Sequence, residues 1–161
     1  MIKVFLSLGT NLGNKQDNLL KANNEIREEI GLVSKLSRIY ETTAWGFESK
    51  DNFLNQVIVV ETDMNPFQLI NSCLAIEKKM GRERKNSKNY ESRIIDIDIL
   101  FYGEEIDNGE GLQIPHSMLH QRRFILEPLN EIAPDLIHPI LGKSISKLLE
   151  ECADTGSVKL F

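Results

Sequence analysis

The sequence predicts an α+β protein with a ferredoxin-like βαββαβ core, an antiparallel sheet, helices packed on that sheet and a C-terminal appendage. Two observations point to this fold. Runs of β-branched and apolar residues, which favour strands, alternate with stretches of helical periodicity in the order strand, helix, strand, strand, helix, strand. The 161 residues, 41% of them hydrophobic, are also enough for a single domain, residues 1–161, with a core of its own.

The spacing of apolar residues, together with one glycine, predicts the secondary-structure elements of residues 2–42. Residues 2–8 place apolar side chains at alternate positions and predict a strand, whereas residues 15–30 carry apolar side chains at helical spacing. Gly31 then supplies a C-terminal helix stop. Residues 32–42 alternate again and predict the second strand.

The third strand and second helix have equally clear signals. Residues 53–62 are rich in β-branched side chains and predict a strand. A helix over residues 66–80 follows, because Pro66 is tolerated at the first helical position and Gly81 ends the apolar pattern. The remaining expectations are a polar loop over residues 82–92, a fourth strand over 93–102 and, in the appendage, helices over about 118–132 and 144–151.

The composition argues against several classes of partner. A formal net charge of −5 disfavours binding to nucleic acid or to a membrane surface, since both usually need a basic face. Two cysteines make no disulfide framework, and the N-terminal apolar run is too short for a signal sequence or a membrane span. We therefore expect a cytoplasmic protein with no nucleic acid and no membrane among its partners. We also expect a monomer.

Asp96 and Asp98 are the most informative residues, because they lie within a run of isoleucines between Arg93 and Leu100. On a strand both side chains point to one face with Cα atoms about 6.5 Å apart, whereas on a helix they would diverge by about 200°. Two carboxylates on a buried face repel each other and need a compensating cation. Two sources of charge stay open: a hard divalent ion, Mg²⁺ or Mn²⁺, or a salt-bridge cluster with Arg93.

Two basic groups are candidates for phosphate binding. Several cations between residues 82 and 88 lead into the aspartate strand, and guanidinium groups make bidentate contacts to phosphate oxygens. An isolated charge run is also typical of a solvated loop. His116 with Arg122 forms the second group, for which a structural histidine is the alternative interpretation.

Phe53 and Asn55 are candidates for recognition of a heterocycle. On a strand they share one face, which would place a stacking ring beside an amide that both donates and accepts hydrogen bonds. An edge aromatic followed by a turn-forming asparagine is the alternative.

Taken together, the motifs show that the chain resembles the 6-hydroxymethyl-7,8-dihydropterin pyrophosphokinase family. Each matching segment is weak alone, but they follow one another in the family's order over nearly the whole chain. The segments are Leu8-Gly9-Thr10-Asn11-Leu12-Gly13, Tyr40-Glu41-Thr42, Phe53-Leu54-Asn55, Glu77 with Gly81-Arg82-Glu83-Arg84, Arg93 with Asp96-Ile97-Asp98-Ile99-Leu100, Ile114-Pro115-His116, Arg122-Arg123-Phe124 and Pro128-Leu129 with Glu131-Ile132-Ala133-Pro134.

The resemblance implies an enzyme of folate biosynthesis that transfers pyrophosphate from ATP to the hydroxymethyl group of the pterin and releases AMP. It implies two Mg²⁺ ions held by Asp96 and Asp98, with Arg82 and Arg93 at the transferring group, so that these four residues are catalytic. The implied ATP site contains Glu77, Arg84, Ile99, His116 and Arg122, and the implied pterin site contains Thr42, Thr43, Trp45, Phe53, Asn55 and Phe124.

The chain departs from the family pattern in places. Tyr90-Glu91-Ser92 stands where many members carry a tryptophan, a glycine and a proline, Phe53 replaces a frequent tyrosine, and Gly111 lies where some members carry an arginine. Two alternatives remain: a non-enzymatic ferredoxin-like module that binds RNA or a small ligand, and another metal-dependent nucleotidyltransferase. An RNA-binding module would carry basic and aromatic residues where this chain has aspartates.

Overall fold

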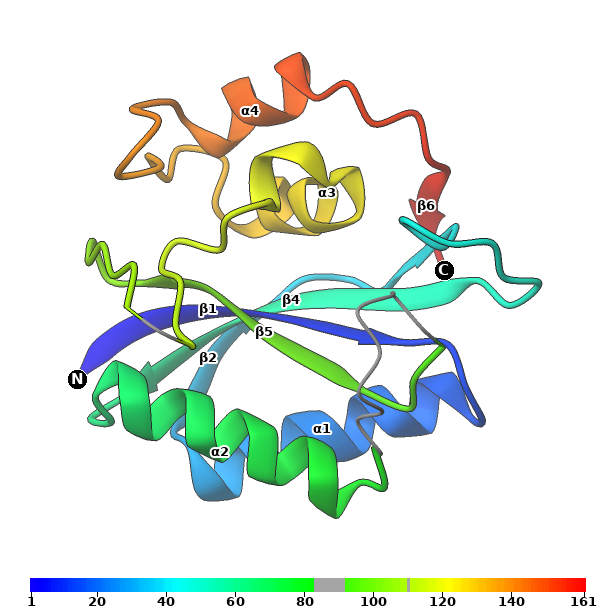
Figure 1. Ribbon diagram of the computed structural model, residues 1–161, viewed down its shortest axis with the longest axis horizontal. Helices are drawn as coiled ribbons and strands as arrows, with labels where there is room; N and C mark the ends of the chain where they lie inside the picture. Colours follow the sequence, from blue (N-terminus) through cyan, green and yellow to red (C-terminus); the bar gives the residue numbers. More distant parts are fainter. Residues whose placement is uncertain (83–91, 110) are drawn as a thin grey trace.

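The computed structural model describes residues 1–82, 92–109 and 111–161 (Figure 1). Within these ranges, four α-helices pack on a six-stranded antiparallel sheet, which confirms the predicted fold class. In chain order the elements are β1 (Ile2–Thr10), α1 (Lys15–Glu29), β2 (Leu32–Leu36), β3 (Tyr40–Thr42), β4 (Phe53–Thr62), α2 (Pro66–Lys79), β5 (Asp96–Tyr102), the short 3₁₀ helix η1 (Leu119–Gln121), α3 (Arg123–Ile132), α4 (Ile145–Glu151) and β6 (Val158–Leu160).

The strand order is that of a ferredoxin-like core. β1 lies between β4 and β5 and is antiparallel to both. The predicted strand over residues 32–42 is instead two strands, β2 and β3, which pair with different parts of β4. Between them, the Ser37 hydroxyl accepts a hydrogen bond from the Val57 N–H at 3.0 Å, and its carbonyl accepts one from Gln56 Nε2 at 2.9 Å. Side-chain hydrogen bonds of this kind replace the regular ladder and divide the strand.

Helices α1 and α2 cover one face of the sheet (Figure 1). The α2 helix begins with a capping box, in which Asn65 and Gln68 each bond through the side chain to the other's backbone. Apolar residues at alternate strand positions and at helical spacing meet between the sheet and these helices. The buried set includes Val4, Leu6 and Leu8 of β1, Ile58 and Val60 of β4, and Leu69, Cys73 and Ile76 of α2.

The C-terminal appendage is more regular than the sequence indicates. Helices α3 and α4 lie on the opposite face of the sheet (Figure 1) and bury a second apolar cluster. The predicted helix over residues 118–132 is divided, because Arg122 is extended at φ −119° and ψ 100°, between η1 and α3. Strand β6 was not predicted, since three residues are too short to show a period. The second cluster includes Val57, Val59, Phe101, Ile125, Leu126 and Leu129.

Small residues of β1 leave space above one end of the sheet. In the register of β1 with β5, Ser7 lies opposite Asp98 and Gly9 lies opposite Asp96. Toward the other end of the same strand pair, two phenylalanine rings pack edge to face with centroids 5.9 Å apart. The large side chains support the helical layer, whereas the small and polar ones leave the sheet surface open to a ligand.

Glu131, near the C-terminal end of α3, ties this helix to the sheet. Its Oε1 accepts hydrogen bonds from Tyr40 Oη at 2.6 Å and Arg38 Nε at 3.1 Å, and its Oε2 accepts the Arg38 N–H at 2.9 Å. Burial raises the pKa of Glu131, but the hydrogen bonds from Tyr40 and Arg38 outweigh it, so the net pKa shift is downward. The carboxylate thereby fixes the position of α3 relative to β3.

We predict that Glu131→Gln lowers the free energy of unfolding at neutral pH by about 1–2 kcal/mol, because a neutral amide cannot accept all three hydrogen bonds. The depressed folded-state pKa means that this stabilisation is fully present above the unfolded value of 4.5 and is lost as the pH falls through the folded value. Urea unfolding at neutral and strongly acidic pH measures it. A difference between wild type and variant that stays constant across this range would contradict the role of the charge.

Candidate active site

A cavity of about 310 Å³ opens where the sheet, the loop after β3 and the segment before α3 meet. Its volume suits a small-molecule ligand. Of the described site residues that the resemblance implies, all line the cavity except Glu77 and Ile99. The predicted lining residues are Thr42, Thr43, Trp45, Phe53, Asn55, Arg82, Arg93, Asp96, Asp98, His116, Arg122 and Phe124, and the lining is completed by Ser7, Gly9, Phe47, Ser117 and Met118.

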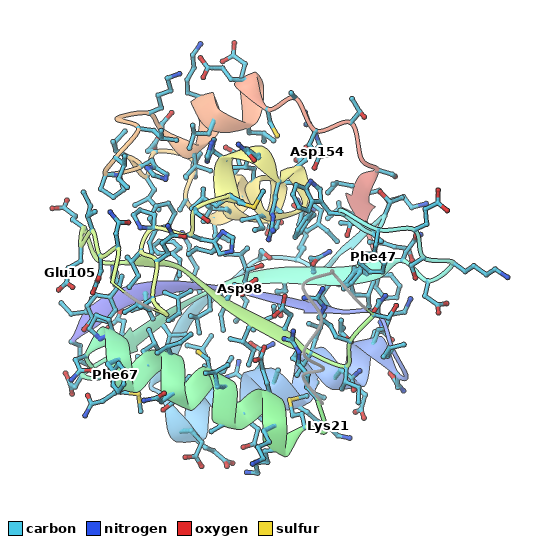
Figure 2. All side chains as sticks on the ribbon, viewed as in Figure 1. Lys21, Phe47, Phe67, Asp98, Glu105 and Asp154 are labelled. Carbon is cyan, nitrogen blue, oxygen red and sulfur yellow. The ribbon has the colours of Figure 1, made fainter. Side chains whose placement is uncertain are left out.

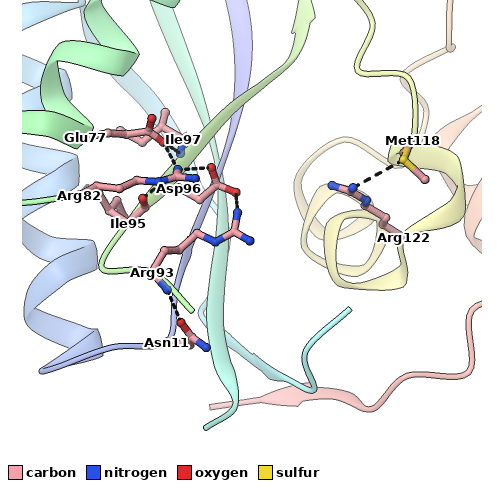
Figure 3. A network of polar contacts seen from close by, with 9 residues as sticks. All are labelled: Asn11, Glu77, Arg82, Arg93, Ile95, Asp96, Ile97, Met118 and Arg122. Carbon is pink, nitrogen blue, oxygen red and sulfur yellow. Dashed lines mark hydrogen bonds and ion pairs between the residues drawn. The ribbon is translucent and has the colours of Figure 1, made fainter. Parts of the chain in front are cut away.

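Asp96 is the centre of an ion-pair cluster (Figure 3). Its Oδ1 accepts a hydrogen bond from Arg82 Nη1 at 2.7 Å, and its Oδ2 accepts one from Arg93 Nη1 at 2.9 Å. Arg82 Nη1 also lies 2.6 Å from Glu77 Oε2, which in turn accepts the backbone N–H of Ile97 at 2.9 Å. The salt-bridge interpretation left open by the sequence therefore holds for Asp96, with a second arginine added.

Asp98 has a different environment. It is half-buried in the cavity wall, and its carboxylate makes no hydrogen bond or ion pair within the described part of the chain. Burial, together with the charge of Asp96, raises the pKa of Asp98 to about 8, although Arg122 and Arg93 act in the opposite direction. A carboxyl group driven toward its protonated form by burial and by a like charge is stabilised by an added cation. The divalent-ion interpretation therefore fits Asp98.

The aspartate pair can hold a metal ion only together with a ligand. Mg²⁺ takes six oxygen ligands, and sites with one or two carboxylates take the rest from phosphates and water. Among the described residues, the only group of three or more close acidic, histidine or cysteine side chains is the largely exposed one of Glu25, Glu28 and Glu29. That group does not line the cavity and is an ordinary acidic helix surface.

Asn11 fixes the segment that carries Arg93. Its Oδ1 accepts the Arg93 N–H at 2.7 Å, its own N–H donates to the Arg93 carbonyl at 3.1 Å, and its Nδ2 donates to Ser92 Oγ at 2.9 Å. These bonds span more than eighty residues of sequence and hold the entry to β5 against the end of β1. The sequence contained a signal for this role, the turn at Gly9-Thr10-Asn11, but gave no partner.

His116 is held as a neutral imidazole. Burial and the cation of Arg122 lower its pKa to about 4, although the charge of Asp96 raises it. Its Nδ1 accepts the Met118 N–H at 3.2 Å, so the proton of the neutral ring lies on Nε2. His116 therefore has a structural bond on one nitrogen and offers one uncharged N–H donor to the cavity.

Aromatic rings form flat apolar walls beside the cations. The Arg122 guanidinium lies 4.5 Å from the ring centroid of Trp45. Phe53 packs edge to face against Phe47, with ring centroids 6.1 Å apart, and the Arg93 guanidinium lies 5.9 Å from the Phe53 ring. Contacts between a cation and an aromatic face restrain both groups, so rings and guanidinium groups are positioned together.

Asn55 and Gly9 define the polar end of the cavity beside Phe53. Asn55 Nδ2 donates to Thr42 Oγ1 at 2.5 Å, which orients the amide. A Cβ atom on Gly9 would lie 3.0 Å from Asn55 Oδ1 and 3.8 Å from Phe53 Cδ1. Glycine thus leaves the space that the amide and the ring require, and Gly9 is a site residue to which the sequence interpretation gave no role.

Among the described residues, two of the predicted site residues, Glu77 and Ile99, do not line the cavity. Glu77 is only 2% exposed. It forms an ion pair with the Arg82 guanidinium instead of reaching the cavity itself. Ile99 belongs to the apolar core on the α1 and α2 side of the sheet. Arg84 lies outside the described residues. Contacts of these residues with ATP stay a prediction.

The fold and the site define an enzyme for transfer of a phosphate-containing group, in which guanidinium groups and a carboxylate pair lie beside rings that can stack on a heterocycle. The sequence model of the 7,8-dihydro-6-hydroxymethylpterin-pyrophosphokinase (HPPK) family matches residues 5–134. The chain belongs to this family, and its function is HPPK activity in folate biosynthesis. The alternatives of a non-enzymatic module and of an unrelated nucleotidyltransferase are thereby excluded.

Curated relatives match nearly the whole chain. The 2-amino-4-hydroxy-6-hydroxymethyldihydropteridine pyrophosphokinase of Aquifex aeolicus is 40% identical over 151 residues, which cover 94% of this chain and 92% of the relative. The enzyme of the same name from Porphyromonas gingivalis is 40% identical over 142 residues, covering 86% of this chain and 95% of that one. The ATP and pterin substrates are those implied by the family.

Solved structures show the same fold. The crystal structure of Plasmodium falciparum HPPK-DHPS with pteroate matches with a TM-score of 0.75 at 19% identity, over 93% of this chain and 44% of that one. This chain therefore spans less than half the length of that protein, and the likeness concerns the fold alone. In the described part of the chain, no helix has the length and apolar character needed to cross a membrane.

We predict that Gly9→Ala raises KM for the pterin substrate about tenfold, the factor that corresponds to about 1.4 kcal/mol of lost binding. The added methyl group would displace the Asn55 amide and crowd the Phe53 ring. Steady-state kinetics with each substrate varied separately measure the effect. Thermal unfolding serves as the control, and a variant with unchanged pterin KM would show that this wall does not contact the substrate.

We predict that Asp98→Asn stabilises the ligand-free protein at alkaline pH in the presence of a chelator. A folded-state pKa of about 8, raised from 3.8, means that the folded chain keeps a proton that the unfolded chain releases, so this group makes stability fall between these pH values. The asparagine variant lacks this loss. Thermal unfolding across the range should show the two proteins converging near pH 4 and separating near pH 8; parallel curves would contradict the raised pKa.

Proposed function

We propose that the cavity transfers the pyrophosphoryl group of ATP to the hydroxymethyl oxygen of 6-hydroxymethyl-7,8-dihydropterin and releases AMP. The observation that carries this proposal is the convergence of three arginines, two aspartates and several aromatic rings on one cavity of about 310 Å³. Guanidinium groups suit phosphate oxygens, carboxylates suit Mg²⁺, and flat rings suit a pterin.

The ATP end of the cavity is assigned to its basic residues. Arg122 and the neutral His116 supply donors for phosphate oxygens, and Arg82 and Arg93 lie at the transferring group. The remaining residues of the proposed ATP site are Glu77, Arg84 and Ile99.

Asp96 and Asp98 are proposed to bind two Mg²⁺ ions. Their oxygen atoms are suitable donors, and among the described residues no cation is bonded to Asp98. Bound Mg²⁺ supplies charge neutralisation of the phosphates and polarisation of the transferring phosphorus. Arg82 and Arg93 form ion pairs with Asp96. When substrate phosphates occupy the cavity, the same two guanidinium groups are within reach of new acceptors.

The pterin end of the cavity is assigned to its aromatic and uncharged polar residues. Phe53 and Phe124 are proposed to stack on the two faces of the ring, and the oriented Asn55 amide to read its polar edge. Thr42, Thr43 and Trp45 line the same region and complete the proposed pterin site. Transfer of this kind asks little covalent chemistry of the protein, so positioning of the two substrates and stabilisation of charge supply the rate enhancement.

The assembly and location are also part of the proposal. We propose that residues 1–161 form a single domain that acts as a monomer. Sedimentation equilibrium tests that state. Use of ATP as co-substrate supports a cytoplasmic location.

The product of the reaction tests the proposed transfer. Purified protein with ATP, Mg²⁺ and 6-hydroxymethyl-7,8-dihydropterin should form AMP and the pterin diphosphate in equal amounts, measured by anion-exchange chromatography. ADP as the nucleotide product, or no turnover, would overturn the proposal.

We predict that Arg82→Ala lowers kcat by about a hundredfold or more, which corresponds to loss of a charge-stabilising contact in the transition state, with a smaller change in the KM for ATP. Ion pairs with Glu77 and Asp96 hold the Arg82 guanidinium at the cavity. Arg27→Ala, which removes an exposed guanidinium bonded to Asn24 on α1, is the matched control and should keep wild-type rates. An effect of Arg82→Ala confined to KM would contradict a transition-state role.

A further inference from the structure

The C-terminal strap, defined as residues 152–160, lies beyond the part of the chain that the family model matches. It runs from the end of α4 to β6, across the second helical layer and toward the loop after β3 (Figure 1). Every second residue is half-buried, namely Cys152, Asp154, Gly156 and Val158, and the residues between them are exposed. This alternation is that of an extended segment with one face packed against the protein.

One end of the strap caps helix α3. The residue at the N-cap position of this helix, Arg122, makes no side-chain cap hydrogen bond. Instead Asp154 Oδ2 accepts the N–H of Arg123 at 3.0 Å, and the Arg123 side chain returns a bond from Nε to the Asp154 carbonyl at 3.0 Å. A carboxylate at this position satisfies an orphan N–H group and interacts favourably with the helix dipole. The cap is thus supplied from 31 residues away in the sequence.

The other end of the strap holds the loop after β3. The carbonyl of Ser157 accepts the Thr43 N–H at 3.2 Å, and in the pairing of β3 with β6, Thr42 lies opposite Val158. Asp154 Oδ1 accepts the Gly156 N–H at 2.9 Å, which fixes the turn between the two attachment points. Figure 2 shows Asp154 on the segment that descends from α4 to β6, above the loop that carries Phe47.

The two attachment points belong to two walls of the cavity. Arg123 lies between Arg122 and Phe124, which both line it, and the Arg122 guanidinium is 5.8 Å from the Phe124 ring. Thr42 and Thr43 line it from the other wall. The strap therefore sets the spacing between the wall that carries Phe124 and the wall that carries the loop after β3.

We propose that Asp154 is a positioning residue for the pterin pocket, which it acts on by capping α3 and joining that helix to the loop after β3. The proposal rests on the assignment of Phe124 and Thr42 to pterin binding. Without the cap, the first turn of α3 loses its defined position, and the ring of Phe124 and the guanidinium of Arg122 are displaced with it. Asp154 itself touches no substrate.

Asp154→Ala tests this role through the two KM values. We expect the KM for the pterin to rise about fivefold, the factor that corresponds to loss of a typical N-cap contact, with a smaller rise for ATP and kcat within about twofold of wild type. Asp154→Asn keeps one acceptor oxygen for the Arg123 N–H, since asparagine caps helices as well as aspartate, but it loses the second oxygen, which accepts the Gly156 N–H. Its rise in pterin KM should therefore be smaller than that of Asp154→Ala. Asp154→Glu keeps the charge but moves the carboxylate, and should raise the pterin KM even where the alanine variant fails to fold.

A matched control separates positioning from loss of stability. Ser144 caps α4 by accepting the Lys147 N–H at 3.1 Å, so Ser144→Ala removes the same kind of contact from a helix that does not line the cavity. This variant should lose similar stability in thermal unfolding while its pterin KM stays unchanged. Equal rises in pterin KM for Ser144→Ala and Asp154→Ala would overturn the proposal.

Tryptophan fluorescence supplies a readout that does not need turnover. Trp45 is the single tryptophan of the chain and lies 4.5 Å from the Arg122 guanidinium. Asp154→Ala should shift its emission without substrate, whereas Ser144→Ala should not. Wild-type emission and wild-type pterin KM in Asp154→Ala would overturn the positioning role. Absence of AMP formation by the wild type would instead overturn the proposed transfer, so the two failures are distinguishable.

Discussion

The carboxylate of Asp96, shared between Arg82 and Arg93, is the interaction on which the rest of the site depends. Two aspartates on one face of a strand repel each other, and the protein places their carboxylates in different environments. Asp96 is neutralised by two arginines, whereas burial and the charge of Asp96 raise the pKa of Asp98 to about 8. Glu77, which is buried on α2, fixes the position of Arg82 through an ion pair. The site therefore contains one carboxylate, Asp96, that is paired with arginines, and another, Asp98, that an added cation would stabilise.

The sheet makes this arrangement possible because its two faces serve different purposes. Toward α1 and α2, the central strands present apolar side chains that form a continuous core. On the opposite face, large side chains support α3 and α4 at one end, and Ser7 and Gly9 leave the surface open beside the aspartates at the other. The second helical layer then provides the roof of the cavity, with Arg122 and Phe124 at the start of α3. The alternation of side chains along the central strands thus produces both the apolar core on one face and, where Ser7 and Gly9 are small, the site on the other.

Much of this was predictable from local sequence. The isoleucine run predicted that Asp96 and Asp98 share a face, and ordered motifs predicted most cavity-lining residues. The burial of Glu77 also had a signal, because it follows Leu69 and Cys73 at helical spacing. What could not be predicted depends on bonds between distant segments. The division of the second strand rests on the bonds of Ser37 with Gln56 and Val57, and the cap of α3 rests on Asp154, for which no local periodicity gives a signal.

We propose that Asp96 and Asp98, whose charges the protein compensates unequally, bind the metal ions together with the substrate phosphates. A crystal structure with Mn²⁺ and a non-hydrolysable ATP analogue tests it directly, because anomalous scattering distinguishes the Mn²⁺ ions from water and from lighter ions. We expect the ions to be bound by carboxylate oxygens of Asp96 and Asp98, with Arg82 or Arg93 turned from Asp96 toward the phosphates. Ions bound away from both carboxylates, with the two arginine pairs of Asp96 intact, would contradict the claim.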